Sequence, residues 1–427
     1  MNREQFINTL GRLVSLGKSL QNSACVGKIP KERLAAAVVL ERLRQPIESG
    51  ALKAELIASP DAPDRTNLWL TLPGDTEETL GFVGAHFDVV PADRDAERWT
   101  SDPFQLVVDA DGTLRGRGVT DCLGHVAVLT ELLADLVERG VKPRRTIHVL
   151  MIANEEESSI PGIGLDYVAS LGRLEVLAKG PLFWLDSADF GPTLGTGGIA
   201  AWELVADGVP GHSGMPQHCV NALELAMACT LELTQWFERT YPPHPDEARW
   251  RYASSSSLKA TMVECENHKV TMIPAQARIK GDIRLTPFYD LDAAVAGAKA
   301  FVEQVEAQLQ SVEPGGRWAK YRTAAGQSGS VRLYPPAHHM AGVACRLDSP
   351  GLLALERAIR RVRGQAGLAP ASMTGSLPLV RDLQRRGFDV QITGFGRQVA
   401  YHAPNEHAHI NDFEDGFSIL CDLIETL

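Results

Sequence analysis

Short apolar runs that end on acidic or histidine residues are the feature that most limits what this chain can fold into. The run 146–153 (TIHVLMIA) leads directly into the acidic stretch 154–157, and the run 182–186 (LFWLD) itself ends on a carboxylate. Such runs, alternating with the amphipathic stretch 124–139, are typical of an α/β domain with a largely parallel sheet. Ligands of open parallel sheets collect beyond the carboxyl ends of the strands, so these polar residues stand where a site is expected.

The pattern changes after the glycine-rich turn 195–198. Apolar alternation and helical periodicity then predict, in chain order, a strand at 201–205, a helix at 222–239, strands at 257–263 and 276–285, and a helix at 290–309. This β-α-β-β-α order favours a small ferredoxin-like domain with an antiparallel sheet. The segment 313–340, rich in Gly, Ser and Pro, is expected to hold loops. We therefore expect a main domain of residues 1–200 and 346–427 and an inserted domain of residues 201–345.

Charge and cysteine content exclude several classes of protein. The 427 residues carry 42 basic and 53 acidic side chains, a net charge of −11, whereas nucleic-acid binding needs a basic face. No apolar stretch approaches the roughly 18 residues of a membrane span, and no signal-peptide run is visible at the start. The seven cysteines contain no CxxC pair, which is typical of reduced thiols. We expect a cytoplasmic protein that binds neither nucleic acid nor membrane.

Two motifs could begin a metal site. His86 could bind zinc through one ring nitrogen while Asp88, two residues on, holds the other ring N–H. A solvated loop histidine would give the same motif. Asp121 lies between a glycine-containing loop and a helix start, where either a carboxylate bridging two cations or a plain N-cap residue would fit.

Further acids and one histidine could complete this site. Glu155 and Glu156 follow the apolar run 146–153. Of two adjacent acids, one can bind a metal ion and the other can take a proton from metal-bound water. A solvated charged loop has the same composition. Asp186 follows another run, with Asp189 as a less favoured substitute, and His402 would be the last ligand. Two histidines and three carboxylates suit zinc best.

These residues resemble the zinc-dependent deacylase and carboxypeptidase family that includes acetylornithine deacetylase, succinyl-diaminopimelate desuccinylase and aminoacylase. The resemblance runs from GAHFDVV through RGRGVTDCLGHVAV, EEESSIPG, GHSG and GDIRLTP to YHAPNE. Phrases such as YPPHP and FDVQITGFG are most similar to plant-type acetylornithine deacetylases. The resemblance implies a metallopeptidase-like α/β catalytic domain with a mostly parallel sheet, and an inserted ferredoxin-like α+β domain that serves as lid and dimerisation domain.

The resemblance also implies a residue-by-residue site with two Zn²⁺ ions per subunit, for which Co²⁺ is a substitute. The implied ligands form two sets that share one carboxylate: His86, Asp121 and Asp186 on one ion, and Asp121, Glu156 and His402 on the other. Around these ligands the resemblance implies Glu155 as general base and Asp88 as a residue that supports a metal ligand. It also implies His212 as lid histidine and Arg284 as the group that binds the substrate carboxylate. The turn of Thr374, Gly375 and Ser376 would either bring backbone N–H groups to the substrate or be a plain turn.

Further implications of the resemblance concern backbone, assembly and substrate. A cis peptide bond is implied between Asp121 and Cys122, and a homodimer in which His212 reaches the partner's zinc site. Deacetylases of this family often carry Glu where Asp186 stands, and Asp is frequent in its peptidases. Thr271 stands where a lid asparagine is common.

The implied activity is hydrolysis of the amide bond of a small N-acyl amino acid. N-acetyl-L-ornithine, cleaved to L-ornithine and acetate in arginine biosynthesis, is the first expectation. The alternative, which Asp186 favours, is a dipeptidase or a broader N-acyl-amino-acid amidohydrolase or carboxypeptidase on the same site. A metal-binding regulatory protein without activity is a third hypothesis. Glu155 argues against it, because a binding module needs no base beside its metal.

Overall fold

The computed structural model describes residues 1–93, 98–157, 160–266, 269–311, 316–335, 339–377 and 379–427. The chain divides into two compact units. The first comprises Met1–Leu194, Cys345–Ala371 and Pro378–Leu427, and the second comprises Gly195–Ala344 and Ser372–Leu377. Each unit has its own cluster of buried apolar side chains. Within the described ranges, no helix has the length and apolar character needed to cross a membrane.

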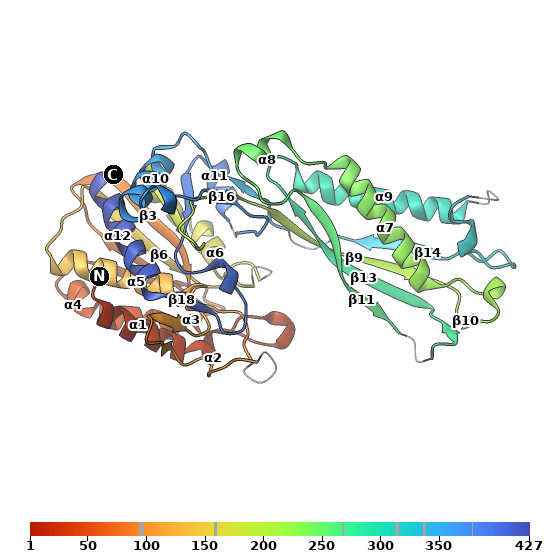
Figure 1. The fold of residues 1–427 in the computed structure, drawn as a ribbon, viewed down its shortest axis with the longest axis horizontal. Helices are drawn as coiled ribbons and strands as arrows, with labels where there is room; N and C mark the ends of the chain where they lie inside the picture. The colour runs from red at the N-terminus through yellow and green to blue at the C-terminus, as the bar shows by residue number, and fades with distance from the viewer. Residues whose placement is uncertain (94–97, 158–159, 267–268, 312–315, 336–338, 378) are drawn as a thin grey trace. The chain divides into compact units, whose positions relative to one another are not determined.

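The first unit is built on a mixed sheet whose central strands are parallel (Figure 1). In spatial order its strands are β1 (Lys53–Ala58), β2 (Thr66–Leu72), β6 (Arg145–Ile152), β3 (Thr76–His86), β7 (Pro181–Leu185), β17 (Asp389–Thr393) and β8 (Thr193–Thr196). The strands from β6 to β17 pair in parallel, whereas β1, β2 and β8 pair antiparallel. This confirms the expected α/β class with a mostly parallel central sheet.

The apolar runs of the sequence are the parallel strands, because these strands are buried on both faces. All of β7 is buried, and so is β6 from Ile147 to Ile152. The helices of this unit pack around the sheet and on one another. They are α1 (Arg3–Ser15), α2 (Gly17–Leu20), α3 (Glu32–Arg42), α4 (Arg44–Glu48), α5 (Leu123–Glu138), α6 (Leu165–Ser170), α10 (Pro350–Arg363), α11 (Val380–Arg385) and α12 (Ile410–Thr426).

The second unit is a four-stranded antiparallel sheet with two long helices (Figure 1). Its elements are β9 (Gly198–Asp207), α7 (Ala222–Thr240), β11 (Ser257–Cys265), β13 (Gln276–Leu285), α9 (Leu291–Gln310) and β14 (Ser330–Tyr334). The spatial order β11-β13-β9-β14 is the ferredoxin-like order that was expected. Buried and exposed side chains alternate along β13, since one sheet face packs against α7 and the other does not.

Shorter elements complete the two units. They are β4 (Val107–Val108), β5 (Thr113–Arg115) and β18 (His407–His409) in the first unit, and β10 (Gly211–His212), β12 (Met272–Ile273), α8 (Pro245–Arg249) and β15 (Val343–Ala344) in the second, while β16 (Ala371–Ser372) pairs with β8. β14 lies inside the segment 313–340 that was expected to hold loops, so this segment also contains a strand that was not predicted. Its residues alternate between buried and exposed, but the run is too short to give a clear pattern among Gly, Ser and Pro.

The structural division differs from the sequence-based one in the segment Ser372–Leu377, which groups with the second unit. The Gly197 N–H donates to the Gly375 carbonyl oxygen over 2.8 Å. A Cβ atom at Gly197 would lie 2.7 Å from the Thr374 carbonyl oxygen, so the close approach requires glycine. This pairing is made between residues far apart in the chain and has no local signal. The lid and dimerisation role of the inserted segment stays a prediction.

Candidate metal centre

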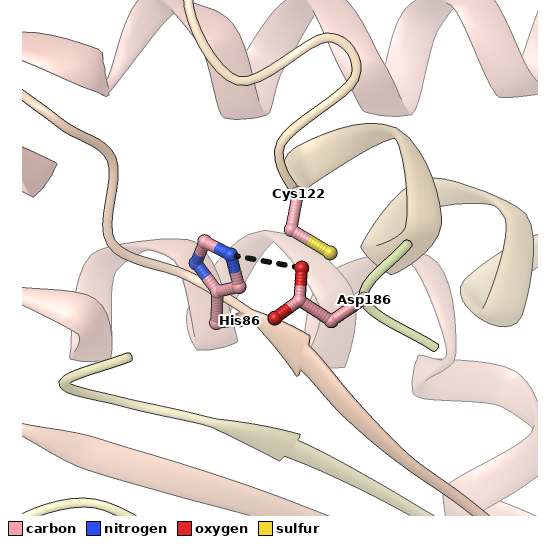
Figure 2. A group of neighbouring side chains, drawn as sticks. All are labelled: His86, Cys122 and Asp186. Atoms are coloured by element: carbon pink, nitrogen blue, oxygen red, sulfur yellow. Dashed lines mark ion pairs between the residues drawn. The ribbon is translucent and has the colours of Figure 1, made fainter. Parts of the chain in front are cut away.

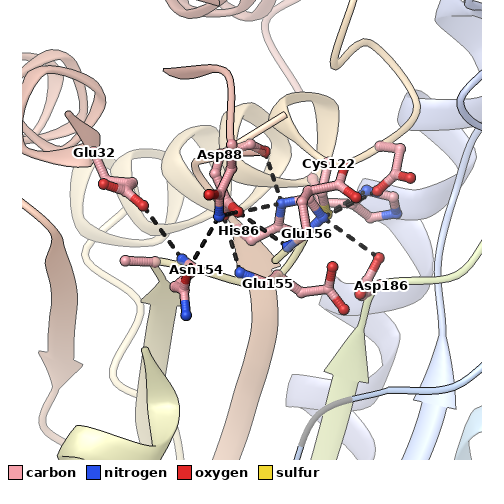
Figure 3. A network of polar contacts seen from close by, with 12 residues as sticks. Glu32, His86, Asp88, Cys122, Asn154, Glu155, Glu156 and Asp186 are labelled. Carbon is pink, nitrogen blue, oxygen red and sulfur yellow. Dashed lines mark hydrogen bonds and ion pairs between the residues drawn. The ribbon is translucent and has the colours of Figure 1, made fainter. Parts of the chain in front are cut away.

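Three neighbouring parallel strands bring acidic and histidine side chains to one edge of the sheet (Figure 3). β3 ends at His86, β7 ends directly before Asp186, and β6 ends at Ile152, shortly before Glu155. Since parallel neighbours end at the same edge, these residues meet although they are far apart in sequence. The loop before α5 adds Asp121. The cluster is therefore built largely from residues that follow strand ends, as was expected.

Asp121 lies between two histidines, with one carboxylate oxygen toward each. His86 Nε2 is 3.0 Å from Asp121 Oδ1, and His402 Nε2 is 3.1 Å from Asp121 Oδ2. His402 Nε2 is also 3.2 Å from Glu156 Oε2, and His86 Nε2 is 3.8 Å from Asp186 Oδ1. The structure thus brings together all five expected ligands, in two groups that share Asp121. That they bind metal ions stays a prediction.

The hydrogen bonds of His86 show that the cluster suits a cation. Its Nδ1 lies 2.9 Å from the main-chain oxygen of Asp88, which can only accept, so Nδ1 carries a proton. In a neutral ring Nε2 then presents a lone pair toward the Asp121 carboxylate, which is also an acceptor. Two facing acceptors need a proton or a metal ion between them. Glu156 Oε1 is buried and has no hydrogen-bond partner among the described residues, a second sign of a missing positive group.

The charge of the cluster also indicates that it suits a cation. Burial, together with the negative charge of Asp121, raises the pKa of Glu156 to about 7. Burial also raises the pKa of Asp186 to about 7 and that of Glu155 well above its usual range. Hydrogen bonds to Asp121 and Glu156 raise the pKa of His402 to about 11. Carboxylates this crowded and buried keep protons unless a bound cation offsets their charge, and a divalent metal would do so.

Asp88 supports both His86 and the acidic loop. Its carboxylate Oδ1 forms the expected ion pair with His86 Nδ1 at 3.6 Å, and its main-chain oxygen lies nearer, at 2.9 Å. The carboxylate also accepts the N–H of Glu155 over 3.2 Å and the N–H of Glu156 over 3.0 Å. Asn22 Nδ2 donates to Asp88 Oδ2 over 2.8 Å. Asp88 therefore orients His86 through its backbone and fixes the acidic loop through its side chain.

A buried polar network from the N-terminal region supports the same loop. Arg65 and Glu32 form an ion pair of 2.8 Å with side chains 5% and 0% exposed. Arg65 Nη2 and Asn22 Nδ2 both donate to Asn154 Oδ1, over 2.9 and 3.1 Å. Asn154 has a positive φ of 59°, which asparagine tolerates better than most residues. The turn there directs the next residue, Glu155, into the cluster.

Glu406 binds the loop that carries Asp121, and no role was predicted for it. Its buried carboxylate accepts the backbone N–H groups of Gly118, Thr120 and Asp121 over 3.0, 2.8 and 3.0 Å. Arg117 Nη1 donates to the same carboxylate over 2.9 Å. The only hint in the sequence was that Glu406 closes the YHAPNE stretch. The peptide bond after Asp121 is cis, as expected.

Cys122 is a second residue that the sequence argument missed. Its sulfur forms a group with His86 and Asp186 in which the potential ligand atoms all lie within 4.8 Å of one another, and all three residues are buried (Figure 2). A second such group consists of His86, Asp121 and Glu156. The signal was present in the sequence, because a cysteine beside an expected metal ligand is a candidate ligand itself.

The remaining expected residues belong to the second unit. His212 is exposed at the end of β10, where its Nδ1 accepts the Gly214 N–H over 3.0 Å. Arg284 Nε donates to Asp282 over 3.0 Å, and its Nη1 lies 3.4 Å from the Thr374 carbonyl oxygen. The structure therefore places Arg284 beside the turn that begins at Thr374. The roles of these residues stay predictions.

We expect replacement of Glu406 by alanine to lower the free energy of unfolding of the first unit by about 3–5 kcal/mol, because a buried charge partner of Arg117 and three amide acceptor contacts are lost together. Glu406→Gln should lose less, since its amide oxygen still accepts. Urea unfolding followed by circular dichroism measures both. Glu414→Ala is the control, because its pair with Arg3 is largely solvent-exposed and should matter little. An alanine variant as stable as the control would contradict the role given to Glu406.

Comparison with known proteins agrees with the expected resemblance. The chain is 38% identical to an acetylornithine deacetylase from Dictyostelium discoideum over 441 aligned residues, covering 100% of this chain and 97% of that protein. It is also 38% identical to an acetylornithine deacetylase from Arabidopsis thaliana, covering 100% of this chain and 96% of that one. The relationship suggested by the sequence motifs is confirmed over the full length.

Solved structures and family models extend the comparison. A dipeptidase from Saccharomyces cerevisiae matches with a TM-score of 0.71 at 18% identity, covering 99% of this chain and 95% of that one. At this identity the match shows a shared fold. The model of peptidase family M20/M25/M40 matches residues 82–426, which include every expected metal ligand. The chain therefore belongs to the peptidase family M20/M25/M40.

Proposed function

We propose that this protein hydrolyses the amide bond of an N-acyl amino acid at a two-zinc centre, with N-acetyl-L-ornithine as its main substrate. The observation that carries the proposal is the cluster of two histidines and three carboxylates, among them the shared Asp121, with Glu155 beside it. The full-length relatives named acetylornithine deacetylase support this substrate. Release of ornithine and acetate would place the reaction in arginine biosynthesis.

The proposed ligand sets are His86, Asp121 and Asp186 for one ion, and Asp121, Glu156 and His402 for the other. Imidazole nitrogen and carboxylate oxygen atoms suit zinc, and Co²⁺ would substitute. When bound, the ions polarise the amide carbonyl and lower the pKa of water to about 7.

Glu155 is the proposed general base because its side chain adjoins the cluster but belongs to neither ligand set. It hydrogen-bonds Asp186, and Asp88 fixes its backbone N–H. Glu155 takes the proton of the attacking water on a carboxylate oxygen. It then delivers this proton to the leaving amine nitrogen, without which the amide bond would not break.

The second unit would supply contacts to the substrate. Because Nδ1 of His212 accepts the Gly214 N–H, the proton of a neutral ring is on Nε2. That N–H can donate to the carbonyl oxygen as negative charge develops there. Arg284, whose guanidinium is oriented by Asp282 and by the Thr374 carbonyl, would bind the substrate carboxylate. Gly375 and Ser376 follow in the same turn.

We also propose that two copies of the chain associate through the second unit. β11 is an edge strand of its sheet, and most of its side chains are exposed. Among them Met262 and Val263 are 55% and 60% exposed. An apolar edge strand is a ready surface for pairing with a second copy, which would remove it from water. A cytoplasmic location fits the reduced state of the cysteines whose side chains the structure describes, since none of these forms a disulfide.

The substrate proposal predicts a clear order of activity on a panel of amides. N-acetyl-L-ornithine should be cleaved with the highest kcat/KM, ahead of N-acetyl-L-methionine and a dipeptide. Ornithine or amino-acid release, measured on the zinc-loaded protein and on a metal-free control, decides the order. The alternative, a dipeptidase or broader amidohydrolase or carboxypeptidase, is favoured by Asp186. Faster cleavage of the dipeptide or of N-acetyl-L-methionine would establish that alternative and overturn the proposed substrate.

The two adjacent glutamates should respond differently to the same substitution. Glu155→Gln should keep two metal ions and the fold but lose about 10²-fold or more in kcat, because it removes a base and no ligand. Glu156→Gln should weaken metal binding instead. Metal content after dialysis, read alongside kcat, separates the two effects. Wild-type kcat in Glu155→Gln would require a different base.

A mixing experiment tests whether His212 acts across the proposed dimer. His212→Ala and Glu155→Gln should each be nearly inactive alone. In a mixed dimer, the His212→Ala chain keeps its own Glu155 and receives His212 from its partner, so one working site returns. Activity is measured after subunit exchange, which native mass spectrometry of differently tagged chains verifies. Verified exchange without recovered activity would place His212 in its own chain's site.

A further inference from the structure

We propose that Cys122 is a sulfur ligand of the metal ion held by His86 and Asp186, so that the two metal positions are chemically different. The inference rests on the proposed two-metal centre and adds a ligand that neither the sequence motifs nor the resemblance assigned. One metal position would then have nitrogen, oxygen and sulfur ligands, and the other would have nitrogen and oxygen ligands alone.

The first observation is the position of the side chain. The Cys122 sulfur lies beside the Asp186 carboxylate, and His86 reaches the same carboxylate from the other side in this view (Figure 2). One potential ligand atom from each of the three residues lies within 4.8 Å of the others. His86 and Cys122 are fully buried, and the Asp186 side chain is 7% exposed. Nitrogen, carboxylate oxygen and sulfur are the three donor types that zinc accepts in proteins.

The second observation is the hydrogen bonding of the neighbouring His125. Its Nε2 accepts the Phe395 N–H over 2.7 Å, so in a neutral ring the proton is on Nδ1. Nδ1 lies 3.3 Å from the Cys122 sulfur, and its N–H therefore points at the sulfur. An N–H donor aimed at a sulfur atom stabilises it as an anionic ligand.

The alternative is that Cys122 is an inert core thiol. Cys345 provides a comparison, because it is another buried cysteine of the first unit. Cys345 is also fully buried in the first unit, and its sulfur lies 3.6 Å from the Thr193 carbonyl oxygen. It belongs to neither of the potential metal-binding groups found among the described residues. The Cys122 sulfur has a comparable contact to the Leu185 carbonyl, at 3.5 Å, but in addition the histidine donor and the two ligand neighbours.

The consequence is an ordered loading of the two positions. With Cys122 the first position has four protein ligands, counting the shared Asp121, which is one more than the second position has. The second has Asp121, Glu156 and His402, and the His402 side chain is 55% exposed. On binding at the first position, the thiol releases one proton to solvent and a metal–sulfur bond forms. The first ion should therefore bind tightly, and the second should exchange.

Cobalt titration of the metal-free, full-length protein tests this proposal. Co²⁺ bound to a thiolate gives a sulfur-to-metal charge-transfer band in the near ultraviolet, which nitrogen and oxygen ligands do not give. In the wild type this band should rise with the first equivalent of Co²⁺ and stay constant during the second. Cys122→Ser should lose the band and keep the visible bands of bound Co²⁺. Cys345→Ser is the matched control and should behave as the wild type.

Three results would overturn the proposal: a wild type that binds two Co²⁺ ions without the band, a band that persists in Cys122→Ser, or a band lost in Cys345→Ser. If Cys122→Ser does not fold, X-ray absorption of the wild type with one equivalent of Zn²⁺ decides instead. It should show a sulfur scatterer at about 2.3 Å, and its absence would also refute the proposal. Two bound ions and hydrolysis without sulfur ligation would leave the proposed function standing, whereas failure to bind any metal would remove both.

Discussion

The crowding of buried negative charge around Asp121 is the constraint on which the first unit depends. Asp121, Glu155, Glu156 and Asp186 meet at one sheet edge, where burial raises the pKa of the last three. Glu406 accepts hydrogen bonds from the Arg117 guanidinium and the Thr120 N–H, and Asp88 accepts one from the Glu156 N–H. These contacts set the geometry of the acidic cluster without neutralising its charge. The arrangement stays incomplete without a cation, which is why we regard it as a metal centre and not as a structural ion-pair network.

Much of this architecture was accessible from sequence, because it follows from a local rule. Strands buried on both faces appear as apolar runs, and the polar residue that follows such a run lies at the sheet edge. This reasoning placed His86, Glu155 and Asp186, since β6, β3 and β7 are neighbours in the sheet. His402 follows no such strand. It was put forward as the last ligand of the set, and its assignment to one of the two ions came from the family resemblance.

The parts that the sequence did not predict depend on contacts between distant segments. Glu406 accepts the N–H of Thr120 across 286 positions, and Asn22 donates to Asp88 across 66. Such hydrogen bonds leave no periodicity or spacing in the chain. The Asp88 carboxylate pairs with His86 as expected, but only the three-dimensional turn shows that the Asp88 main-chain oxygen is nearer to the ring. β14 was missed because a strand of five residues gives too weak a pattern.

The network of Asn22, Glu32 and Arg65 bears on how this enzyme could change over evolutionary time. All three residues precede the segment 82–426 that the family model matches, yet they contact Asn154 or Asp88 directly. The N-terminal region is therefore not an independent appendage to a self-sufficient catalytic module. Exchange of this region between relatives would succeed only where the acidic loop changes with it, so the two segments are expected to be inherited together.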